Sequence, residues 1–204
     1  MLNKLILLPT AYLAPISYYA ILLQYLNCEI ESHEHFIKQS IRNRCEIYSA
    51  NGKLRLTIPK KRKGSSKTII KHIEISYKDN WQKEHWNSIV SCYNSSPFFE
   101  YYKDEIKPFF QQKETYLIRF NTKLQELILS FLKETPSYTY SKKYKHKGNF
   151  TDLRNYKFLT QKIIKYNQVF MEKNNFIPNL SILDLLFNLG PESRDYLINI
   201  DTNL

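Results

Sequence analysis

Residues 5–31 read LILLPTAYLAPISYYAILLQYLNCEIE, and this stretch decides the fold class. Residues 5–8 form a short, uninterrupted apolar run that ends at Pro9, which is the pattern of a strand buried on both faces. Over residues 16–26 the apolar side chains recur with helical spacing. Residues 28–31 can form a second short strand. The stretch therefore predicts a unit of strand, loop, helix and strand.

A β-hairpin is predicted further along the chain. Asn51-Gly52 lies between two arms, residues 45–50 and 53–58, and both turn residues accept the positive φ of a type I′ turn. Apolar and polar residues alternate in the second arm, so one face of it is expected to be buried. Residues 69–77 are predicted to add a third strand to this hairpin.

The rest of the chain is predicted to be mainly helical, because apolar residues recur at intervals of three and four. The predicted helices begin at Trp81 and after Pro97, cover residues 116–132, 152–165 and 181–188, and end in a final amphipathic segment; residues 137–141 read as a strand and 142–149 as an exposed basic loop. The fold class is therefore α/β of a mixed α+β type, with an N-terminal strand-loop-helix-strand unit, a central hairpin with a third strand, and a helical C-terminal half packed on the sheet. No repeat or compositional break divides the chain, so residues 1–204 are expected to form a single domain.

The composition is that of an ordinary globular protein and narrows the function by exclusion. The chain has 204 residues, of which 43% are hydrophobic and 24% charged. Its four glycines are too far apart to build the phosphate-binding loop of a dinucleotide site or a P-loop. The 30 Lys and Arg residues exceed the 19 acids, which gives a net charge of +11. An anionic partner fits this charge, although Lys-rich surfaces are also common in proteins from AT-rich genomes.

Nucleic-acid binding, a metal site and a membrane segment are each disfavoured by the sequence. The basic run at residues 60–63 has no interleaved aromatic side chains for base stacking, so we do not expect nucleic-acid binding. His33-Glu34-His35 is a close cluster of metal-ligand types, but partly exposed histidines explain it without a metal. The longest apolar stretch is interrupted by prolines and polar residues, so we expect no signal peptide and no membrane span. Three cysteines without C-x-x-C spacing indicate reduced thiols and a cytoplasmic location.

The first candidate binding segment precedes the hairpin, where residues 38–44 read KQSIRNR. The guanidinium groups of Arg42 and Arg44 can bind phosphate or carboxylate in a bidentate manner. Gln39 and Asn43 can supply further hydrogen bonds. A solvated turn before the hairpin explains the same polarity, so the segment predicts either an anion site or a polar turn.

The second candidate segment is the run of residues 176–192. Ser181, Asp184 and Asn188 fall on one face of the predicted helix, among residues apolar enough to be buried. Buried polar groups need partners, either in the protein or in a ligand. Asp184 is therefore interpreted either as a structural tether to the hairpin or the arginine segment, or as a catalytic carboxylate.

Four blocks in a fixed order carry a family resemblance over nearly the whole chain. They are TAY with PISY in residues 10–18, KQS with RNR in 38–44, NSSPFFEYY in 94–102, and the run 179–192. With these blocks the chain resembles the WbqC-like family, whose members are encoded in bacterial O-antigen and other surface-polysaccharide loci. The family pattern has His-Gln-Pro after the first strand, whereas residues 8–10 here read LPT. This departure removes a histidine from that position.

The resemblance implies a role in the biosynthesis of surface polysaccharide or another envelope glycan, with no settled reaction. On this basis we expect a transferase that moves a group or an acyl unit onto a sugar nucleotide or amino sugar. The alternative is a non-catalytic binding protein for a glycan precursor or a partner enzyme. The cofactor and the oligomeric state stay open.

The same resemblance assigns roles to the candidate residues. The candidate catalytic residues are Asp184 or Glu192 as general base, with His33 or Tyr12 in place of the missing histidine. The residues expected to bind the anionic substrate or orient the acceptor are Lys38, Gln39, Arg42, Asn43, Arg44, Asn179, Ser181 and Asn188. We further expect the arginine segment and the run 179–192 to meet in one cleft.

Overall fold

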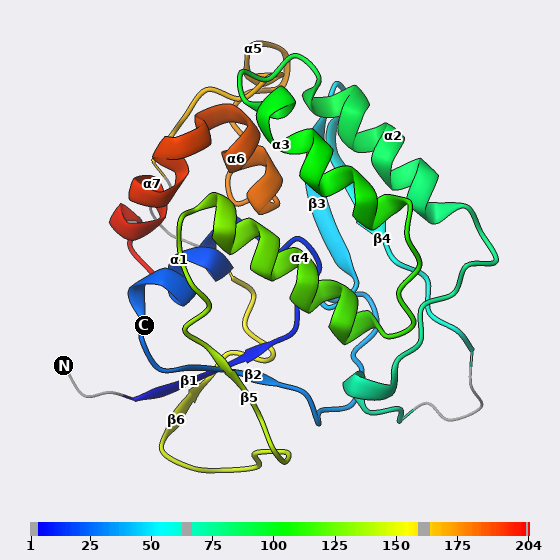
Figure 1. The fold of residues 1–204 in the computed structure, drawn as a ribbon. Helices are drawn as coiled ribbons and strands as arrows, with labels where there is room; N and C mark the ends of the chain where they lie inside the picture. Colours follow the sequence, from blue (N-terminus) through cyan, green and yellow to red (C-terminus); the bar gives the residue numbers. More distant parts are fainter. Residues whose placement is uncertain (1–3, 63–66, 159–163, 203) are drawn as a thin grey trace.

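The computed structural model describes residues 4–62, 67–158, 164–202 and 204, and a parallel sheet lies at its base in Figure 1. The sheet has the strand order β5-β2-β1-β6. Its strands are β1 (Leu5–Pro9), β2 (Cys28–Glu31), β5 (Thr139–Tyr140) and β6 (Phe150–Asp152). β1 is central and almost entirely buried, as its apolar run predicts.

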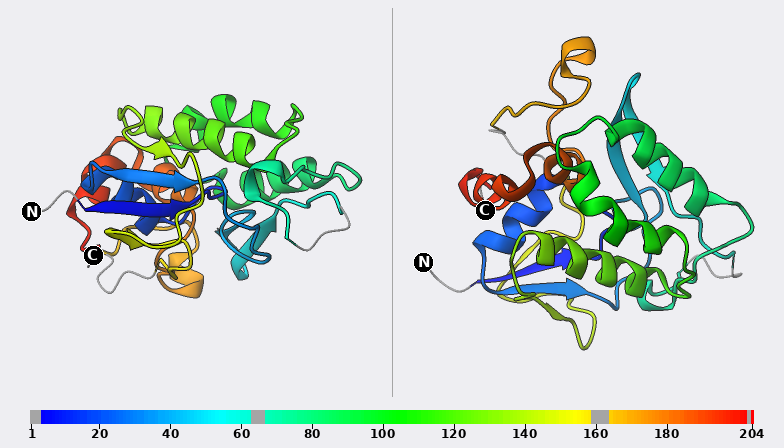
Figure 2. Two further views of the ribbon diagram at one scale, coloured as in Figure 1. Left: turned by 90° about the horizontal axis from the view of Figure 1, so that it is seen from below. Right: turned by 45° about the horizontal axis from the view of Figure 1, so that its top comes forward.

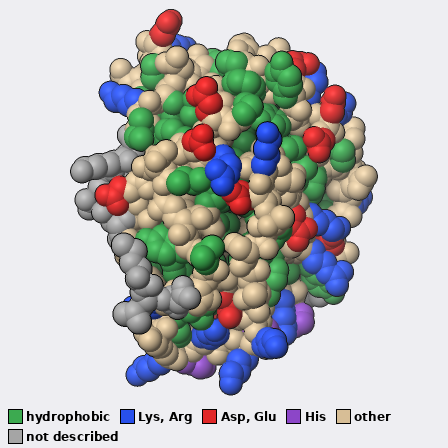
Figure 3. All heavy atoms as spheres, turned by 60° about the vertical axis from the view of Figure 1, so that its left-hand side comes forward, with side chains coloured by type: hydrophobic (Ala, Val, Ile, Leu, Met, Phe, Trp, Pro, Cys, Tyr) green, Lys and Arg blue, Asp and Glu red, His purple; other side chains and the backbone are tan. Residues whose placement is uncertain are grey.

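Helix α1 (Ile16–Gln24) joins β1 to β2, which confirms the predicted N-terminal unit. In Figure 1, α1, α4 (Leu117–Phe131) and α6 (Ile182–Leu189) lie above the sheet, and the chain between β5 and β6 lies below it. That lower segment contains the exposed basic stretch predicted from the sequence. Figure 3 shows Lys and Arg side chains gathering toward this lower end of the molecule.

The hairpin stands beside the parallel sheet and is steeply inclined to it (Figures 1 and 2). Its strands are β3 (Arg44–Ser49) and β4 (Gly52–Thr57), which confirms the predicted hairpin. The predicted type I′ turn at Asn51-Gly52 is wrong, because Ser49 pairs with Gly52, so Ala50 and Asn51 form the turn, and Asn51 does not have a positive φ. Gly52 has a φ of +95°, a conformation that L side chains rarely adopt.

The predicted third strand of the hairpin is absent from the described residues. A short 3-10 turn, η1 (Ile70–His72), interrupts residues 69–77, and only isolated bridges follow, between Lys60 and Ile75 and between Glu74 and Tyr116. The reason is that this segment divides its backbone hydrogen bonds between two neighbours, the chain after β4 and the chain that enters α4. The apolar residues of this segment, among them Ile73 and Ile75, are buried as their alternation indicates, but the segment does not form a regular strand.

Besides α1, four of the predicted helices are confirmed and one, over residues 152–165, is not. The helical elements besides α1 are α2 (Trp81–Tyr93), α3 (Phe99–Ile106), η2 (Lys107–Phe110), α4, α5 (Met171–Asn174), α6, η3 (Gly190–Glu192) and α7 (Ser193–Asn199). Of the weak helix predicted over 152–165, residues 153–158 are not helical, and 159–163 lie outside the described residues. Within the described chain, no helix has both the length and the apolar character needed to cross a membrane.

One hydrophobic cluster joins the N-terminal unit, the hairpin and the C-terminal helices. Phe187 of α6 packs against Tyr93 and Phe99, with ring centroids 5.1 and 5.2 Å away. Next to α6, Gly190 adopts a φ of +55° and faces the ring of Phe98. The C-terminal segment is thus held to α2 and α3 by aromatic contacts.

We predict that Gly190→Ala lowers the free energy of unfolding by about 2–3 kcal/mol, because a Cβ there would lie 2.4 Å from Phe98 Cδ1 in a backbone conformation unfavourable for alanine. Gly52→Ala is the control, since it also has a positive φ but no atom within 4 Å of the added Cβ. It should cost only about 1 kcal/mol. Urea unfolding measures both, and equal losses would contradict the steric argument.

Candidate functional site

Three loops leave the carboxyl edge of the parallel sheet and form the candidate site. They follow β1 (residues 10–15), β2 (residues 32–43) and β6 (residues 153–158). In open α/β sheets, ligands bind beyond this edge. The loops here build two features, a buried network of charges and a cavity.

The buried network is centred on an ion pair between Glu34 and Arg42. Nε and Nη2 of Arg42 donate to the two Glu34 carboxylate oxygens at 2.7 and 2.6 Å, and both side chains are nearly inaccessible to solvent. Nη2 also donates to the carbonyl of Arg154 at 3.0 Å, and Nη1 to Ser40 Oγ at 3.2 Å. Burial raises the pKa of the Glu34 carboxyl, although Arg42 acts in the opposite direction. Arg42 therefore ties the loop after β2 to the loop after β6.

A second arginine extends this network. Nε and Nη2 of Arg154 donate to the Asp152 carboxylate at 2.9 and 2.6 Å, which lowers the pKa of Asp152. Nη1 of Arg154 lies 3.4 Å from the carboxylate of Glu31, which is fully buried at the end of β2. Glu31 also accepts a hydrogen bond from Ser141 Oγ, just after β5. The network therefore links three of the four strands.

His33 lies at the partly exposed rim of the network. Its Nδ1 is 3.0 Å from Ser32 Oγ and 3.3 Å from Ser141 Oγ, and it lies 4.0 Å from the Glu31 carboxylate. No group of three or more metal-ligating side chains occurs in the described part of the chain. His33 is thus placed at the sheet edge, among hydroxyl groups.

Three residues of the 38–44 segment do not line the cavity described next. Arg42, expected from the sequence to hold an anion, instead directs its guanidinium at Glu34 and at the loop carbonyl. Asn43 is buried and donates its amide to the Ile58 carbonyl at 2.8 Å. Lys38 is exposed to solvent.

A cavity of about 390 Å³, here called the Arg44 cavity, lies between the hairpin and these loops. This volume is within the range of small-molecule sites. The lining residues come from two distant parts of the chain. Segment 38–44 supplies Gln39, Ser40 and Arg44, and the run 179–192 supplies Asn179 and Ser181. Part of the arginine segment, without Arg42, therefore meets the start of the run 179–192 in one cavity.

Positive charge dominates the Arg44 cavity. Arg44, Lys53, Arg55 and Lys157 line it, against the single carboxylate of Glu46. Glu46 accepts hydrogen bonds from Arg55 at 2.8 Å and Lys53 at 3.3 Å; burial raises its pKa, but these contacts outweigh burial and lower it overall. Among the described residues, Arg44 and Lys157 have no ion-pair partner, and the buried Nε of Arg44 has no acceptor. The cavity therefore presents uncompensated cations.

The backbone around the Arg44 cavity is strained. Leu13, Gln39, Phe158 and Asn179 all line it and have φ values of 42°, 58°, 45° and 57°. The left-handed conformation costs an L residue about 1–2 kcal/mol, and it is rare for side chains such as Leu and Phe. Strained residues gather at ligand-binding and catalytic sites because other contacts there enforce the geometry.

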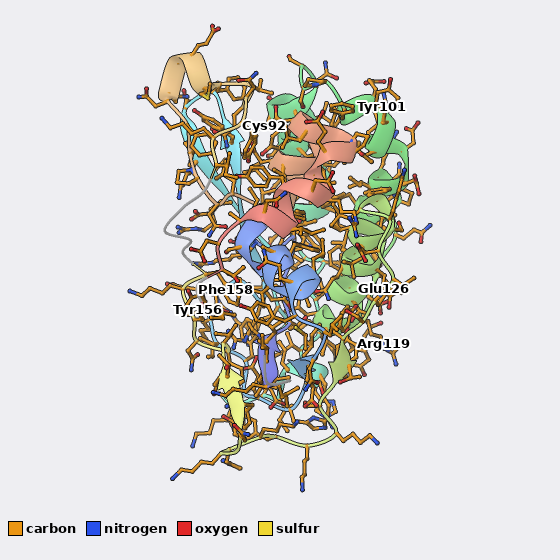
Figure 4. All side chains as sticks on the ribbon, turned by 90° about the vertical axis from the view of Figure 1, so that its left-hand side faces the viewer. Cys92, Tyr101, Arg119, Glu126, Tyr156 and Phe158 are labelled. Carbon is orange, nitrogen blue, oxygen red and sulfur yellow. The ribbon has the colours of Figure 1, made fainter. Side chains whose placement is uncertain are left out.

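Asn179 holds part of this strained backbone in place. Its Oδ1 accepts from the Ser17 backbone N–H at 2.9 Å, and its Nδ2 donates to the Phe158 carbonyl. Ser17 Oγ donates to the same carbonyl at 2.8 Å. The Phe158 ring is packed between Tyr18 and Tyr156, and Figure 4 shows Tyr156 and Phe158 next to each other at one side of the molecule. Asn179 thus shapes the cavity wall through its amide.

The remainder of the 179–192 run lies elsewhere. Ser181 lines the Arg44 cavity and also caps α6 by accepting from the Leu183 N–H. Asn188 and Glu192 line a different cavity, at the other end of α6. The single cleft expected from the sequence therefore contains only the beginning of the run.

Asp184 is fully buried and lines neither of these cavities. Its carboxylate accepts hydrogen bonds from Tyr166 Oη, from Gln168 Nε2 at 2.8 Å and from Tyr93 Oη at 3.0 Å. Tyr93 Oη in turn accepts from the Tyr48 N–H of β3 at 3.0 Å, so the carboxylate is linked to the hairpin. Burial raises the pKa of Asp184 to about 6, against the effect of these three donors. This geometry matches the tether interpretation.

Tyr12 lies in the core. Its hydroxyl is 2.9 Å from Nδ1 of His85, and its ring packs near Phe120. Burial lowers the pKa of His85 to about 4, so this histidine is neutral at pH 7. Tyr12 does not line the Arg44 cavity.

Several residues of the buried charge network and of the Arg44 cavity were not identified from the sequence. Lys53 and Arg55 alternate with apolar residues of β4, which was a usable signal that they share the polar face of the hairpin. Glu31 ends a short buried strand and Glu34 follows it, at the place where side chains reach the sheet edge. Lys157 belongs to no recognisable pattern.

Breaking the Glu34–Arg42 pair should destabilise the fold, because the remaining charge would be buried alone. We expect Glu34→Leu and Arg42→Met each to lower the free energy of unfolding by about 3–5 kcal/mol. The double variant should lose clearly less than the sum of the two. Urea unfolding of the four proteins closes this cycle, and additive losses would show that the two side chains do not depend on each other.

Asp184 should make stability depend on pH. Its pKa is raised to about 6 in the folded chain, from about 3.9 in an unfolded one. Between these values the folded state binds the proton more readily, so lowering the pH from 7 to 4 stabilises the wild type. Relative to Asp184→Asn, the gain between pH 7 and pH 4 should be about 2 kcal/mol, because at pH 4 the unfolded chain is itself partly protonated. Urea unfolding of both proteins across this range tests it; a constant difference between them would argue against a raised pKa.

Comparison with known proteins identifies the family. The uncharacterised protein Rv1507c of Mycobacterium tuberculosis is 26% identical over 196 residues, which cover 79% of this chain and 83% of that protein. No solved structure gives a significant match. The family model for the WbqC-like protein family matches residues 11–157 and 137–196. With most of its length matched, this chain belongs to the WbqC-like protein family.

Proposed function

We propose that the protein acts in the biosynthesis of a surface polysaccharide or other envelope glycan, as a transferase of a group or acyl unit onto a sugar nucleotide or amino sugar. The observation that carries the proposal is the Arg44 cavity, where strained backbone and uncompensated cations converge at the carboxyl edge of the sheet. An anionic substrate such as a sugar nucleotide would supply the missing negative charge. Three free, buried cysteines support a cytoplasmic location for this activity.

The side chains of the cavity suit a phosphate or diphosphate group. Arg44 offers a planar guanidinium whose Nε has no acceptor among the residues that the structure describes, and Lys157 offers a flexible ammonium group. Lys53 and Arg55 are already paired with Glu46, so they contribute less free charge. Gln39 and Ser40 can supply neutral hydrogen bonds from the loop after β2. In this arrangement, Arg44 and Lys157 are the main anion-binding residues.

A non-catalytic binding protein for a glycan precursor is the second candidate, and Glu46 is the observation that favours it. Glu46 is the one carboxylate among the residues lining the cavity, and its pKa is lowered by its two basic partners. A carboxylate in that state is a weak general base at neutral pH. Binding without turnover fits this arrangement.

Binding of anionic sugars tests the proposal. We expect UDP-sugars or sugar phosphates at one hundred times their Kd to stabilise the wild type by about 2.7 kcal/mol, measured by thermal unfolding and calorimetry. Arg44→Gln should weaken binding about tenfold or more, because it removes a charge-assisted hydrogen bond. Arg119→Gln is the control for charge, since Arg119 is exposed on α4, on the side away from Phe158 in Figure 4.

The outcomes separate the candidates. Binding that Arg44→Gln weakens, with product formed from an amino-sugar acceptor, supports the transferase. The same binding without product from any donor and acceptor pair supports the binding protein. If no anionic sugar binds, or if Arg44→Gln binds as tightly as Arg119→Gln, the Arg44 cavity is not the substrate site.

A further inference from the structure

A second and larger cavity lies at the C-terminal end of α6. It has a volume of about 800 Å³ and lies between α6, α7 and residues 164–169; we call it the α7 groove. The side chains that matter for its chemistry are Asn188, Glu192, Asp195 and Asn199. The Arg44 cavity reaches Ser181, the N-cap residue of α6, whereas the groove is lined by Asn188 and Leu189 at the end of this eight-residue helix, about 12 Å further along its axis. The two are therefore separate sites.

Two asparagine side chains leave free hydrogen-bond acceptors in the α7 groove. Asn188 Nδ2 donates to the Asp184 carbonyl at 2.7 Å, and Asn199 Nδ2 donates to the Asp195 carbonyl at 2.9 Å. Each asparagine thereby uses a donor within its own helical segment, and in the described chain neither Oδ1 has a partner. Asn188 is about nine-tenths buried, so its carbonyl oxygen is held in a fixed place on the groove wall. A ligand must bring donors to these oxygens.

The charge of the groove is opposite to that of the protein as a whole. Glu192 and Asp195 line it against the single ammonium group of Lys165, in a chain whose net charge is +11. Glu192 has no partner among the described residues, and Asp195 has only a long contact to Arg194 at 3.6 Å. Figure 3 is turned toward the side of the molecule on which α7 lies, and both acidic and basic side chains are visible on its upper half. Acids also stabilise the first turn of a helix, but that does not account for the free amide oxygens beside them.

Gln168 and Tyr166 give the groove a rigid floor. Gln168 Nε2 donates to Asp184 and to the Ile177 carbonyl, and its Oε1 accepts from the Ile177 N–H. Tyr166 Oη donates to Asp184 as well, and its ring packs edge-on against Tyr196. These side chains have no free polar groups for a ligand, so recognition falls to other side chains of the lining, among which the two asparagines and the two acids supply acceptors.

We propose that the α7 groove binds a saccharide that carries a protonated amine. The ammonium group would lie between the Glu192 and Asp195 carboxylates, which are neighbours at a spacing of three residues. Hydroxyl groups of the same sugar would donate to the Oδ1 atoms of Asn188 and Asn199. The site goes beyond the proposed function, because it does not use the Arg44 cavity and binds a ligand of the opposite charge.

Calorimetric titration of the purified chain with glucosamine, N-acetylglucosamine and glucuronate tests this site. Glucosamine should bind at least about tenfold more tightly than the other two, because only it carries a positive charge. Asp195→Asn should remove most of that preference and leave the weak binding of N-acetylglucosamine unchanged. Asp195 is largely exposed, so the variant should fold, and thermal unfolding confirms this. Glu100→Gln, an exposed acid on α3 paired with Lys103, is the control for the loss of one charge and should behave as the wild type.

Three results would overturn the proposal. They are equal binding of glucosamine and N-acetylglucosamine, an undiminished preference in Asp195→Asn, and tighter binding of spermidine than of glucosamine, which would indicate a plain polyamine site. Arg44→Gln distinguishes the two sites. It should leave glucosamine binding intact even if anionic sugars fail to bind anywhere, so failure of the Arg44 cavity and failure of the α7 groove are read separately.

Discussion

The buried ion pair between Glu34 and Arg42 constrains the rest of the candidate site. Each charge is tolerable away from water only because the other is present, so the loop that carries both must keep one shape. The bond from Arg42 to the Arg154 carbonyl extends that constraint to the loop after β6. Two residues later, Arg44 begins β3 and turns toward the cavity. Arg42, whose guanidinium is hydrogen-bonded within the protein, thereby positions Arg44, whose Nε has no acceptor among the described residues.

The Arg44 cavity combines two unfavourable features that a ligand would relieve or exploit. Cations that lack partners repel one another, and left-handed Leu13 and Phe158 hold backbone in a conformation that their side chains disfavour. Neither feature helps the folded chain by itself. Both are maintained by contacts outside the cavity, among them the Asn179 amide and the Ser17 hydroxyl. The strained backbone and the unpaired cations thus lower the stability of the fold, and they suit the binding of a ligand.

Local signals predicted much of the fold, and long-range ones did not. The apolar run of β1, the Asn51-Gly52 signal for a hairpin and the helical spacing of α4 act within a few residues, so the sequence alone reveals these elements. β6 has three residues and depends on β1 for its hydrogen bonds, so no periodicity marks it. The sequence gives no reason to treat Arg42 and Arg44 differently. In the structure Glu34 pairs with the guanidinium of Arg42, and the guanidinium of Arg44 lines the cavity.

The order of strands along the chain also bears on how the molecule folds. β1 and β2 are joined by one short helix and can pair early. β6 pairs with the other side of β1, and most of the chain lies between these two strands in the sequence. Long-range strand pairing is slow, because the entropy of closing a large loop is lost before contacts form. During synthesis the carboxyl edge of the sheet is therefore unfinished until residue 154 has emerged. We expect this edge to be completed late in folding, so a chain released too early would keep its first helix and lack its binding surface.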